Sequence, residues 1–317
     1  MKHLNKRLIG LGFLLASGAA AFAQTAPPDT KGTGEQVQPG TGATEPKPAN
    51  TLNVHGLFGV DFPTHYISRG LDLEDQGFIA QPYIELDFTL QEGDGFISKT
   101  VAFGGIWSSL HSQHTDQGLA SGTPGVSATD VWYENDWYFG VAFDLAKNFN
   151  LNLSYWEFTS PNDGFGTSKN LQAKLAYNDV DAWGGKGFAL KPYGIVFIET
   201  DGKAGSGSDE GVYIELGIEP TVYSFNSDSA YPVAISVPVK VGLGFSDFYE
   251  DDETLGFVSA GLKLSVPLAF IPSSYGSWSA YSSVTYYFYG DGVDDFNKLA
   301  GDGDDDIVAA FGVSMTF

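Results

Sequence analysis

Residues 233–245 read VAISVPVKVGLGF, and this stretch decides the fold. Every second residue is large and apolar, whereas the residues between them, such as Ser236 and Lys240, are small or polar. Strict alternation predicts a β-strand with one apolar and one polar face. The stretches 258–270 (VSAGLKLSVPLAF) and 307–317 (IVAAFGVSMTF) repeat the pattern.

The length of these stretches distinguishes a membrane strand from a soluble one. Each runs for roughly 11–13 residues, whereas strands of soluble sheets usually have ~5–6 and a tilted membrane-crossing strand needs ~9–11. The small, polar second face suits an aqueous interior. We therefore predict an all-β fold, a transmembrane antiparallel up-and-down β-barrel of about 12 strands. The expected strands are 52–62, 78–90, 99–109, 135–145, 149–158, 168–178, 187–199, 210–221, 232–246, 255–269, 277–289 and 306–317.

The connections between these segments also alternate. One set is long or acidic and is expected outside the cell: 63–77, 110–134, 159–167, 200–209, 247–254 and 290–305. The other set is shorter and is expected in the periplasm: 91–98, 146–148, 179–186, 222–231 and 270–276. An even strand count with both termini in the periplasm predicts the same arrangement.

Composition excludes several classes of protein, and the N-terminal segment indicates the compartment. The chain has 317 residues, no cysteine and a net charge of −23, which argues against a disulfide scaffold and a nucleic-acid binder. A basic start, an apolar run and a small-residue site predict a signal peptide over 1–23. Residues 24–50 are rich in Pro, Gly and Thr and predict a disordered linker. The barrel is expected to occupy 51–317, in the outer membrane of a Gram-negative-type bacterium.

Aromatic residues gather near the predicted strand ends, as in the interfacial girdles of membrane barrels. We expect them on the lipid side, with the outer girdle formed by Phe62, Trp107, Trp137 and Phe197. The periplasmic girdle is expected to contain Phe88, Phe149, Tyr177, Phe270, Trp278 and Phe317.

The opposite phase of the same strands predicts the residues that line the lumen. The candidate lumen and constriction residues are Asp61, Arg69, Glu85, Asp87, Asp144, Lys174, Lys191, Glu199, Glu215, Glu219, Lys240 and Lys263. Charges of both signs across a water-filled pore set up a transverse field that acts on passing solutes. The competing interpretation is that these charges pair and plug a narrow barrel.

Arg69 follows the first predicted strand in the sequence Tyr66-Ile67-Ser68-Arg69-Gly70. A guanidinium offers a rigid donor fork that lysine lacks. Folded inward, Arg69 would pin the first loop inside the barrel by pairing with an acid such as Asp61 or Glu85. It would alternatively act as a cation at a constriction, or be an incidental loop residue.

The C-terminus carries a specific pattern. Phe317 is the last residue and is preceded at alternate positions by Met315, Val313 and Phe311. This resembles the terminal signal that the barrel-assembly machinery reads.

The acidic outer loops contain a weak calcium candidate, Asp302, Asp304 and Asp306, because Ca²⁺ prefers several oxygen ligands. No other metal and no cofactor is expected.

The first strands also resemble a known family. They read YISRGL at 66–71, QPYIELD at 81–87 and FGGIWS at 103–108, and this pattern is similar to the TorF-like porin family. The resemblance covers about the first fifth of the folded part. It implies a barrel of about twelve strands whose solute is generally unassigned.

The pattern favours a porin-like channel for passive diffusion of small hydrophilic solutes, with a preference for cations because of the acidic loops. Its expected partners are outer-membrane lipids, lipopolysaccharide, the barrel-assembly machinery and the solutes, with no nucleic acid. One alternative is a non-conducting structural or adhesion barrel. Another is an outer-membrane lipid hydrolase built on His111, Ser112 and His114, although we expect no enzyme because no strand carries an outward Ser/His pair.

Overall fold

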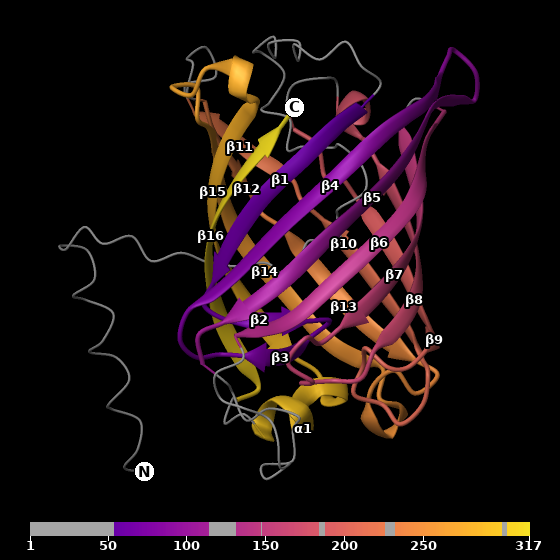
Figure 1. The fold of residues 1–317 in the computed structure, drawn as a ribbon, viewed down its shortest axis with the longest axis vertical. Coiled ribbons are helices and arrows are strands. Elements are labelled where there is room, and N and C mark those ends of the chain that lie inside the picture. The colour runs from indigo at the N-terminus through magenta and orange to yellow at the C-terminus, as the bar shows by residue number, and fades with distance from the viewer. Residues whose placement is uncertain (1–53, 114–130, 147, 184–187, 226–231, 300–302) are drawn as a thin grey trace, which may run out of the picture.

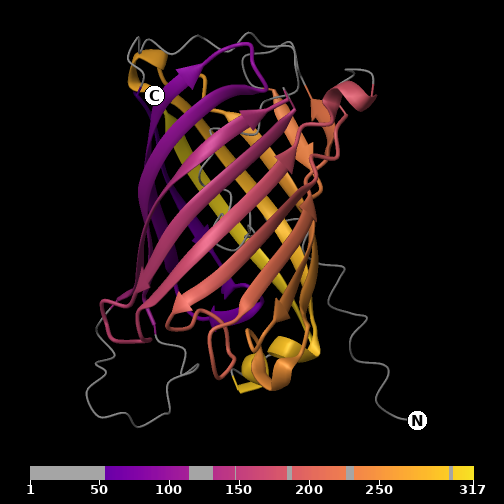
Figure 2. The same ribbon diagram turned by 90° about the vertical axis from the view of Figure 1, so that its right-hand side faces the viewer.

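The computed structural model describes residues 54–113, 131–146, 148–183, 188–225, 232–299 and 303–317. The predicted signal peptide and linker lie outside these residues. The fold is a closed antiparallel β-barrel of twelve tilted wall strands (Figures 1 and 2). The first eight wall strands are β1 (Val54–Pro63), β4 (Ile79–Glu92), β5 (Ile97–His111), β6 (Trp132–Leu145), β7 (Phe149–Thr159), β8 (Ser168–Tyr177), β9 (Tyr193–Asp201) and β10 (Val212–Ile218). The other four are β13 (Val239–Phe245), β14 (Leu255–Pro267), β15 (Ser277–Tyr289) and β16 (Asp305–Thr316).

The barrel closes where the last strand pairs with the first. β1 and β16 are antiparallel, with Leu57 opposite Thr316 and Asp61 opposite Gly312. Gly56 and Phe317 exchange two backbone hydrogen bonds of 3.1 Å each. A Cβ on Gly56 would lie 2.2 Å from the ring of Phe317, so a larger residue here would displace that ring. The terminal phenylalanine is therefore seated on the first strand and completes the wall.

Two of the predicted strands are interrupted by proline. The segment expected at 210–221 forms β10 and then β11 (Thr221–Phe225), and the segment expected at 232–246 forms β12 (Val233–Ser236) and then β13. Pro220 and Pro238 lie at the breaks, where the missing N–H removes a ladder hydrogen bond. Their carbonyls still accept bonds of 3.0 and 2.8 Å from the backbone N–H groups of Val237 and Gly261, so the wall continues.

The strand expected at 187–199 begins later than predicted, at Tyr193. Lys191 has a φ of +50°, in the left-handed region, and Pro192 follows it. The carboxylate of Asp179 accepts hydrogen bonds from the N–H groups of Leu190 (3.0 Å) and Lys191 (2.8 Å). These bonds hold the segment as a loop, so the apolar alternation that precedes Tyr193 does not form a strand.

The outside of the barrel is an apolar belt. Large apolar side chains are exposed along the wall strands, for example Phe58 (42%), Ile84 (43%), Phe139 (53%), Leu262 (49%) and Ile307 (64%). A continuous belt of this kind is far larger than the apolar patches of soluble monomers. It matches the lipid-facing band of membrane barrels.

Two members of the predicted outer girdle face the other way. Trp107 and Phe197 are 1% and 0% exposed and lie inside the barrel, whereas Trp137 is 37% exposed on the outside. Both residues occupy the inward phase of their strands, so the prediction of a lipid-side position for them was wrong. Inward aromatic residues fill the interior of this barrel. The position of an aromatic residue near a strand end does not show which side of the wall it faces.

The ends of the barrel differ. The terminal end is where β1 begins and β16 ends; the opposite, loop end carries the hairpin of β2 (Tyr66–Ser68) and β3 (Leu71–Glu74) together with helix α1 (Asp291–Leu299) (Figure 1). In the described part of the chain, short 3₁₀ helices span Val180–Trp183, Glu250–Asp252 and Ser273–Tyr275. Within the described residues, no helix has both the length and the apolar character needed to cross a membrane.

Helix α1 was expected as loop. Its apolar residues Val293 and Phe296 and the amide residue Asn297 have the i, i+3, i+4 spacing of one helix face. Asp291 lies in the first turn and Lys298 in the last, which complements the helix dipole. This spacing was present in the sequence, but the surrounding run of acids obscured it.

Candidate functional site

The first loop of the barrel folds inward as a small hairpin. β2 and β3 pair with Ser68 opposite Leu71, so Arg69 and Gly70 form a two-residue turn. Their φ values are +49° and +93°, the left-handed values that a type I′ hairpin turn requires at both central positions. Glycine takes this conformation without strain. The Arg69-Gly70 pair therefore decides that the chain reverses here.

The hairpin is buried within the loop-end half of the lumen. Ile67 and Leu71 are 1% and 3% exposed and belong to one apolar cluster with inward aromatic residues of the wall. The wall members of this cluster are Phe103, Tyr138, Ala142, Trp156, Phe158, Ile195, Phe197, Tyr213, Phe257, Tyr287, Tyr289 and Val308. The loop-end half of the barrel thus has a packed core with the hairpin inside it. We call residues 66–74 the plug hairpin.

Arg69 lies at the tip of the plug hairpin and is 7% exposed. Its guanidinium carbon is 3.9 Å from the ring centroid of Phe197 and 5.0 Å from that of Phe158. The ring of Tyr213 lies 6.0 Å away. A desolvated cation over an aromatic face is held by the ring quadrupole. The contacts of Arg69 thus include an aromatic cage, which was not among the acidic partners expected from the sequence.

The tip is also held from the loop end. The amide of Asn297, on α1, donates to the carbonyl of Gly70 (2.9 Å) and accepts from the N–H of Asp72 (3.0 Å). The hydroxyl of Tyr249 donates to the carbonyl of Arg69 (2.7 Å). Burial raises the pKa of Tyr249, so this hydroxyl keeps its proton over the whole neutral range. Hydrogen bonds from α1 and from the loop before β14 therefore hold the tip of the hairpin inside the barrel.

A second set of contacts joins the plug hairpin to the wall. Tyr66 donates a hydrogen bond of 2.6 Å to Glu134 on β6. On β5, the Nε2 of His111 is 2.8 Å from the hydroxyl oxygen of Ser109, and its Nδ1 is 3.6 Å from a carboxylate oxygen of Glu74 on the hairpin. The order serine, histidine, acid resembles that of a hydrolase triad.

The surroundings of this triad-like chain favour a structural role. Ser109 is 0% exposed and Glu74 is 1% exposed, so a substrate has no path to the hydroxyl while the hairpin is docked. The ring of Tyr133 stacks on His111 at 4.7 Å. Of the predicted cluster of His111, Ser112 and His114, His114 lies outside the described residues.

Two lysine–carboxylate pairs also line the lumen, one of them next to the packed cluster. Lys240 is 3.4 Å from Glu215, which also accepts hydrogen bonds from the hydroxyls of Tyr193 (2.7 Å) and Tyr213 (2.8 Å). Lys263 is 3.0 Å from Glu219. Because each lysine offsets the charge of its neighbouring carboxylate, the electric field beside these two pairs is small.

The remaining candidate lumen residues divide into two groups. Those that point inward from the wall strands, fully or partly buried, are Asp61, Glu85, Asp87, Asp144 and Lys174. Two others serve loops instead. Glu199 accepts backbone hydrogen bonds from Gly205 (2.8 Å) and Gly211 (2.6 Å), and Lys191 lies in the loop before β9.

Several buried polar atoms on the inward face of the wall have no hydrogen-bond partner among the described residues. They are Oδ1 of Asn152, Nδ2 of Asn170 and Oγ1 of Thr285, each on a side chain that is 3% exposed or less. Buried polar groups are nearly always satisfied by protein or by ordered water. These inward positions are therefore expected to hold water.

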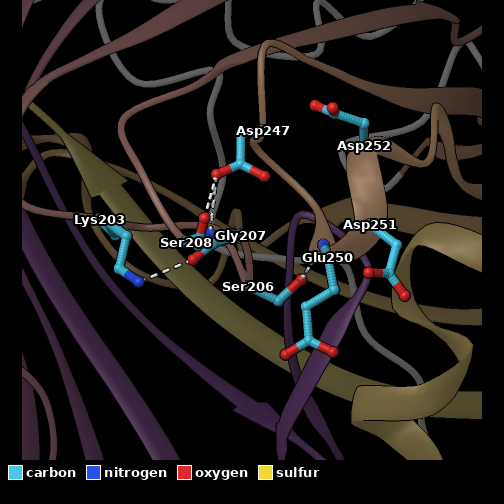
Figure 3. A pocket seen from close by; sticks show the side chains of 8 residues that line it. All are labelled: Lys203, Ser206, Gly207, Ser208, Asp247, Glu250, Asp251 and Asp252. Carbon is cyan, nitrogen blue, oxygen red and sulfur yellow. Dashed lines mark hydrogen bonds between the residues drawn. The ribbon is translucent and has the colours of Figure 1, made fainter.

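The loops at the loop end surround an open hollow of about 670 Å³ (Figure 3). Its lining residues are Lys203, Ser206, Gly207, Ser208, Asp247, Glu250, Asp251 and Asp252. One oxygen of Asp247 accepts hydrogen bonds from the hydroxyl (2.6 Å) and N–H (3.0 Å) of Ser208. The Ser208 hydroxyl is the main cause that holds the pKa of Asp247 below its usual value. The carboxylate therefore fixes one loop against the next.

The calcium candidates do not form one group in the described structure. Asp302 lies outside the described residues, and the carboxylate of Asp304 is 77% exposed, 3.9 Å from the ammonium of Lys298. Asp306 instead lies beside His65 and Asp72. The sequence suggested no such grouping, because His65 and Asp72 lie in the first loop and Asp306 lies on the last strand, and the two segments meet only when the barrel closes.

Comparison with protein-family models finds no match to the chain. Comparison with curated proteins finds no match either. Among solved structures, the COG4313 outer membrane channel from Pseudomonas putida F1 is 11% identical with a TM-score of 0.45, covering 87% of this chain and 99% of that one. The beta domain of the Bordetella autotransporter BrkA is 11% identical with a TM-score of 0.41, over 84% and 98% of the two chains. NanC porin is 11% identical with a TM-score of 0.36, over 83% and 98%.

Proposed function

We propose that this protein is a porin-like channel of the bacterial outer membrane, with a hydrated lumen that the plug hairpin narrows at the loop end. The observation that carries the proposal is the polar surface inside the barrel, where Asn152, Asn170 and Thr285 present buried polar atoms without partners among the described residues. A barrel that served only as a membrane anchor has no need to bury unsatisfied polar groups, which cost free energy unless water reaches them.

The outside of the wall supports the membrane location. Apolar side chains such as Phe58, Phe139 and Ile307 are exposed around the barrel and require lipid contact. We propose that outer-membrane lipids cover this belt and that lipopolysaccharide surrounds the acidic loops.

We also propose that Phe317, seated on Gly56, presents the terminal signal to the assembly machinery. The resemblance to the TorF-like family stays a prediction.

The charges of the lumen support small hydrophilic solutes with a preference for cations. Acids outnumber lysines among the candidate residues inside the barrel: Asp61, Glu85, Asp87, Asp144, Glu215 and Glu219 stand beside Lys174, Lys240 and Lys263. An excess of carboxylates along a pore raises the local concentration of cations and lowers that of anions.

One observation favours a second candidate, a non-conducting barrel with a structural or adhesion role. The aromatic cluster around the plug hairpin is packed as tightly as a protein core, with Tyr287 and Phe197 both 0% exposed. If the hairpin never leaves this cluster, the water of the terminal-end half does not connect to the loop end.

Conductance separates the two candidates. The full chain and a variant in which residues 66–74 are replaced by a short Gly/Ser linker are reconstituted in planar bilayers, and folding of both is checked by heat-modifiable migration in gels. The channel predicts small steps for the full chain, steps at least about tenfold larger for the variant, and reversal potentials in a KCl gradient that indicate cation preference. A folded linker variant without steps above background would establish the non-conducting barrel.

A further inference from the structure

Three side chains with metal-binding atoms meet where the plug hairpin contacts the wall. His65 precedes β2, Asp72 is on β3, and Asp306 is in the second position of β16. Each offers one ligand atom, and these atoms all lie within 4.8 Å of one another. The Nδ1 of His65 is 2.7 Å from Oδ2 of Asp72. Asp72 is fully buried, whereas His65 and Asp306 are partly exposed.

We propose that His65, Asp72 and Asp306 form a binding site for a transition-type divalent cation such as Zn²⁺, held by one imidazole nitrogen and two carboxylate oxygens. Such an ion lies about 2.0–2.2 Å from nitrogen and oxygen ligands in tetrahedral geometry, so its ligand atoms are roughly 3.4 Å apart. To bind it, the 2.7 Å separation of His65 Nδ1 and Asp72 Oδ2 widens, and a separation at the 4.8 Å upper bound narrows by roughly 1.4 Å. Water completes the coordination from the half-exposed side.

The chemistry of the ligands indicates the class of metal. Ca²⁺ and Mg²⁺ prefer shells made of oxygen, with six or more ligands for Ca²⁺. Imidazole nitrogen suits Zn²⁺, Ni²⁺, Cu²⁺ and iron, and carboxylates are compatible with the same ions. The mixed nitrogen and oxygen set therefore distinguishes this site from the acidic loops, which offer oxygen alone.

A supporting layer of hydrogen bonds already orients two of the ligands. The second oxygen of Asp72 accepts from the N–H of Glu74 (3.3 Å), and the N–H of Asp72 donates to Asn297 (3.0 Å). Oδ2 of Asp306 accepts from the hydroxyl of Tyr289 (3.0 Å). Bonds of this kind fix ligand geometry and contribute strongly to metal affinity.

The site has a mechanical consequence. Asp72 belongs to the plug hairpin and Asp306 to the wall strand that closes the barrel. An ion between them joins the hairpin to the wall and stabilises the docked state by mass action. This consequence does not depend on the proposed channel activity, because a non-conducting barrel with the same hairpin would bind the ion equally well.

Zinc titration tests the proposal on the untagged full chain, folded in detergent and freed of metal with EDTA. Calorimetry is expected to show one Zn²⁺ per chain, with no comparable uptake of Ca²⁺ at the same concentration. The substitutions H65Q and D306N are each expected to weaken zinc binding by at least about tenfold. Two matched controls, H55Q on β1 and D305N next to the ligand, remove the same side-chain types elsewhere and are expected to leave the affinity unchanged.

A measurement on the unmodified protein makes the test independent of variant folding. Co²⁺ bound by nitrogen and oxygen ligands is expected to give visible absorption distinct from that of the aqueous ion, and one equivalent of Zn²⁺ is expected to abolish it. The proposal is overturned if Co²⁺ shows only its aqueous spectrum. It is also overturned if D305N and D306N weaken zinc binding equally, because the acidic surface would then be the cause.

Discussion

Arg69→Ala is expected to release the plug hairpin from the lumen. The wild-type guanidinium lies 3.9 Å from the centroid of Phe197 and 5.0 Å from that of Phe158, at 7% exposure. A desolvated cation–π contact contributes up to about 2 kcal/mol. Two such contacts, with lost packing of the side-chain stem, give a loss of roughly 3 kcal/mol. Because about 1.4 kcal/mol corresponds to a factor of ten, the docked-to-undocked ratio falls about 100-fold.

Hydrogen exchange followed by mass spectrometry measures this ratio directly, since amides of residues 66–74 exchange only when the hairpin leaves the core. Protection there is expected to fall about 100-fold, while the wall strands β7 and β8 keep theirs. Arg69→Lys keeps the charge but loses the flat guanidinium and is expected to give an intermediate value. Lys203→Ala, in the outer hollow, serves as the control. Hairpin protection within threefold of wild type in a folded Arg69→Ala variant would refute the reasoning.

Three further predictions concern other parts of the molecule. Gly70→Ala places a Cβ 2.8 Å from the ring of Phe257 at a φ of +93°, so hairpin protection is expected to drop by at least tenfold while the barrel still shows heat-modifiable migration. Burial of Asp179 opposes its ionisation, but N–H donors led by Lys191 outweigh it and lower its pKa, so the stabilisation is present above the ordinary carboxyl pKa and is lost as pH falls through the folded value. Asp179→Asn is therefore expected to lower the melting temperature at pH 7 and to have a progressively smaller effect as the pH falls below the ordinary carboxyl pKa; an equal loss at pH 7 and at low pH would contradict this assignment. Lys240→Met removes the cation 3.4 Å from Glu215, and reversal potentials in a KCl gradient are expected to shift toward cations; an unchanged potential would show that this pair lies outside the ion path.

The candidate site was only partly predictable, for reasons visible in particular residues. Alternation gave the inward phase of Glu215 and Lys240, but it could not separate a lumen residue from a loop anchor. Glu199 lies in the inward phase of β9, yet it accepts hydrogen bonds from the loop that follows the strand. Trp107 and Phe197 stand near strand ends as girdle residues do, yet they line the interior, because the plug hairpin offers them an apolar surface there.

The sequence by itself determined the barrel. Its alternating segments, the even strand count and the terminal Phe317 predicted a closed all-β membrane fold, which the structure confirms, because strand periodicity and length are local properties of the chain. The sequence also marked Arg69 as unusual. Only the tertiary structure decided where it lies. The meeting of His65, Asp72 and Asp306, and the cage of Phe158 and Phe197 around Arg69, join segments far apart in the chain. Such contacts depend on barrel closure and on the inward path of one loop, and neither follows from local pattern.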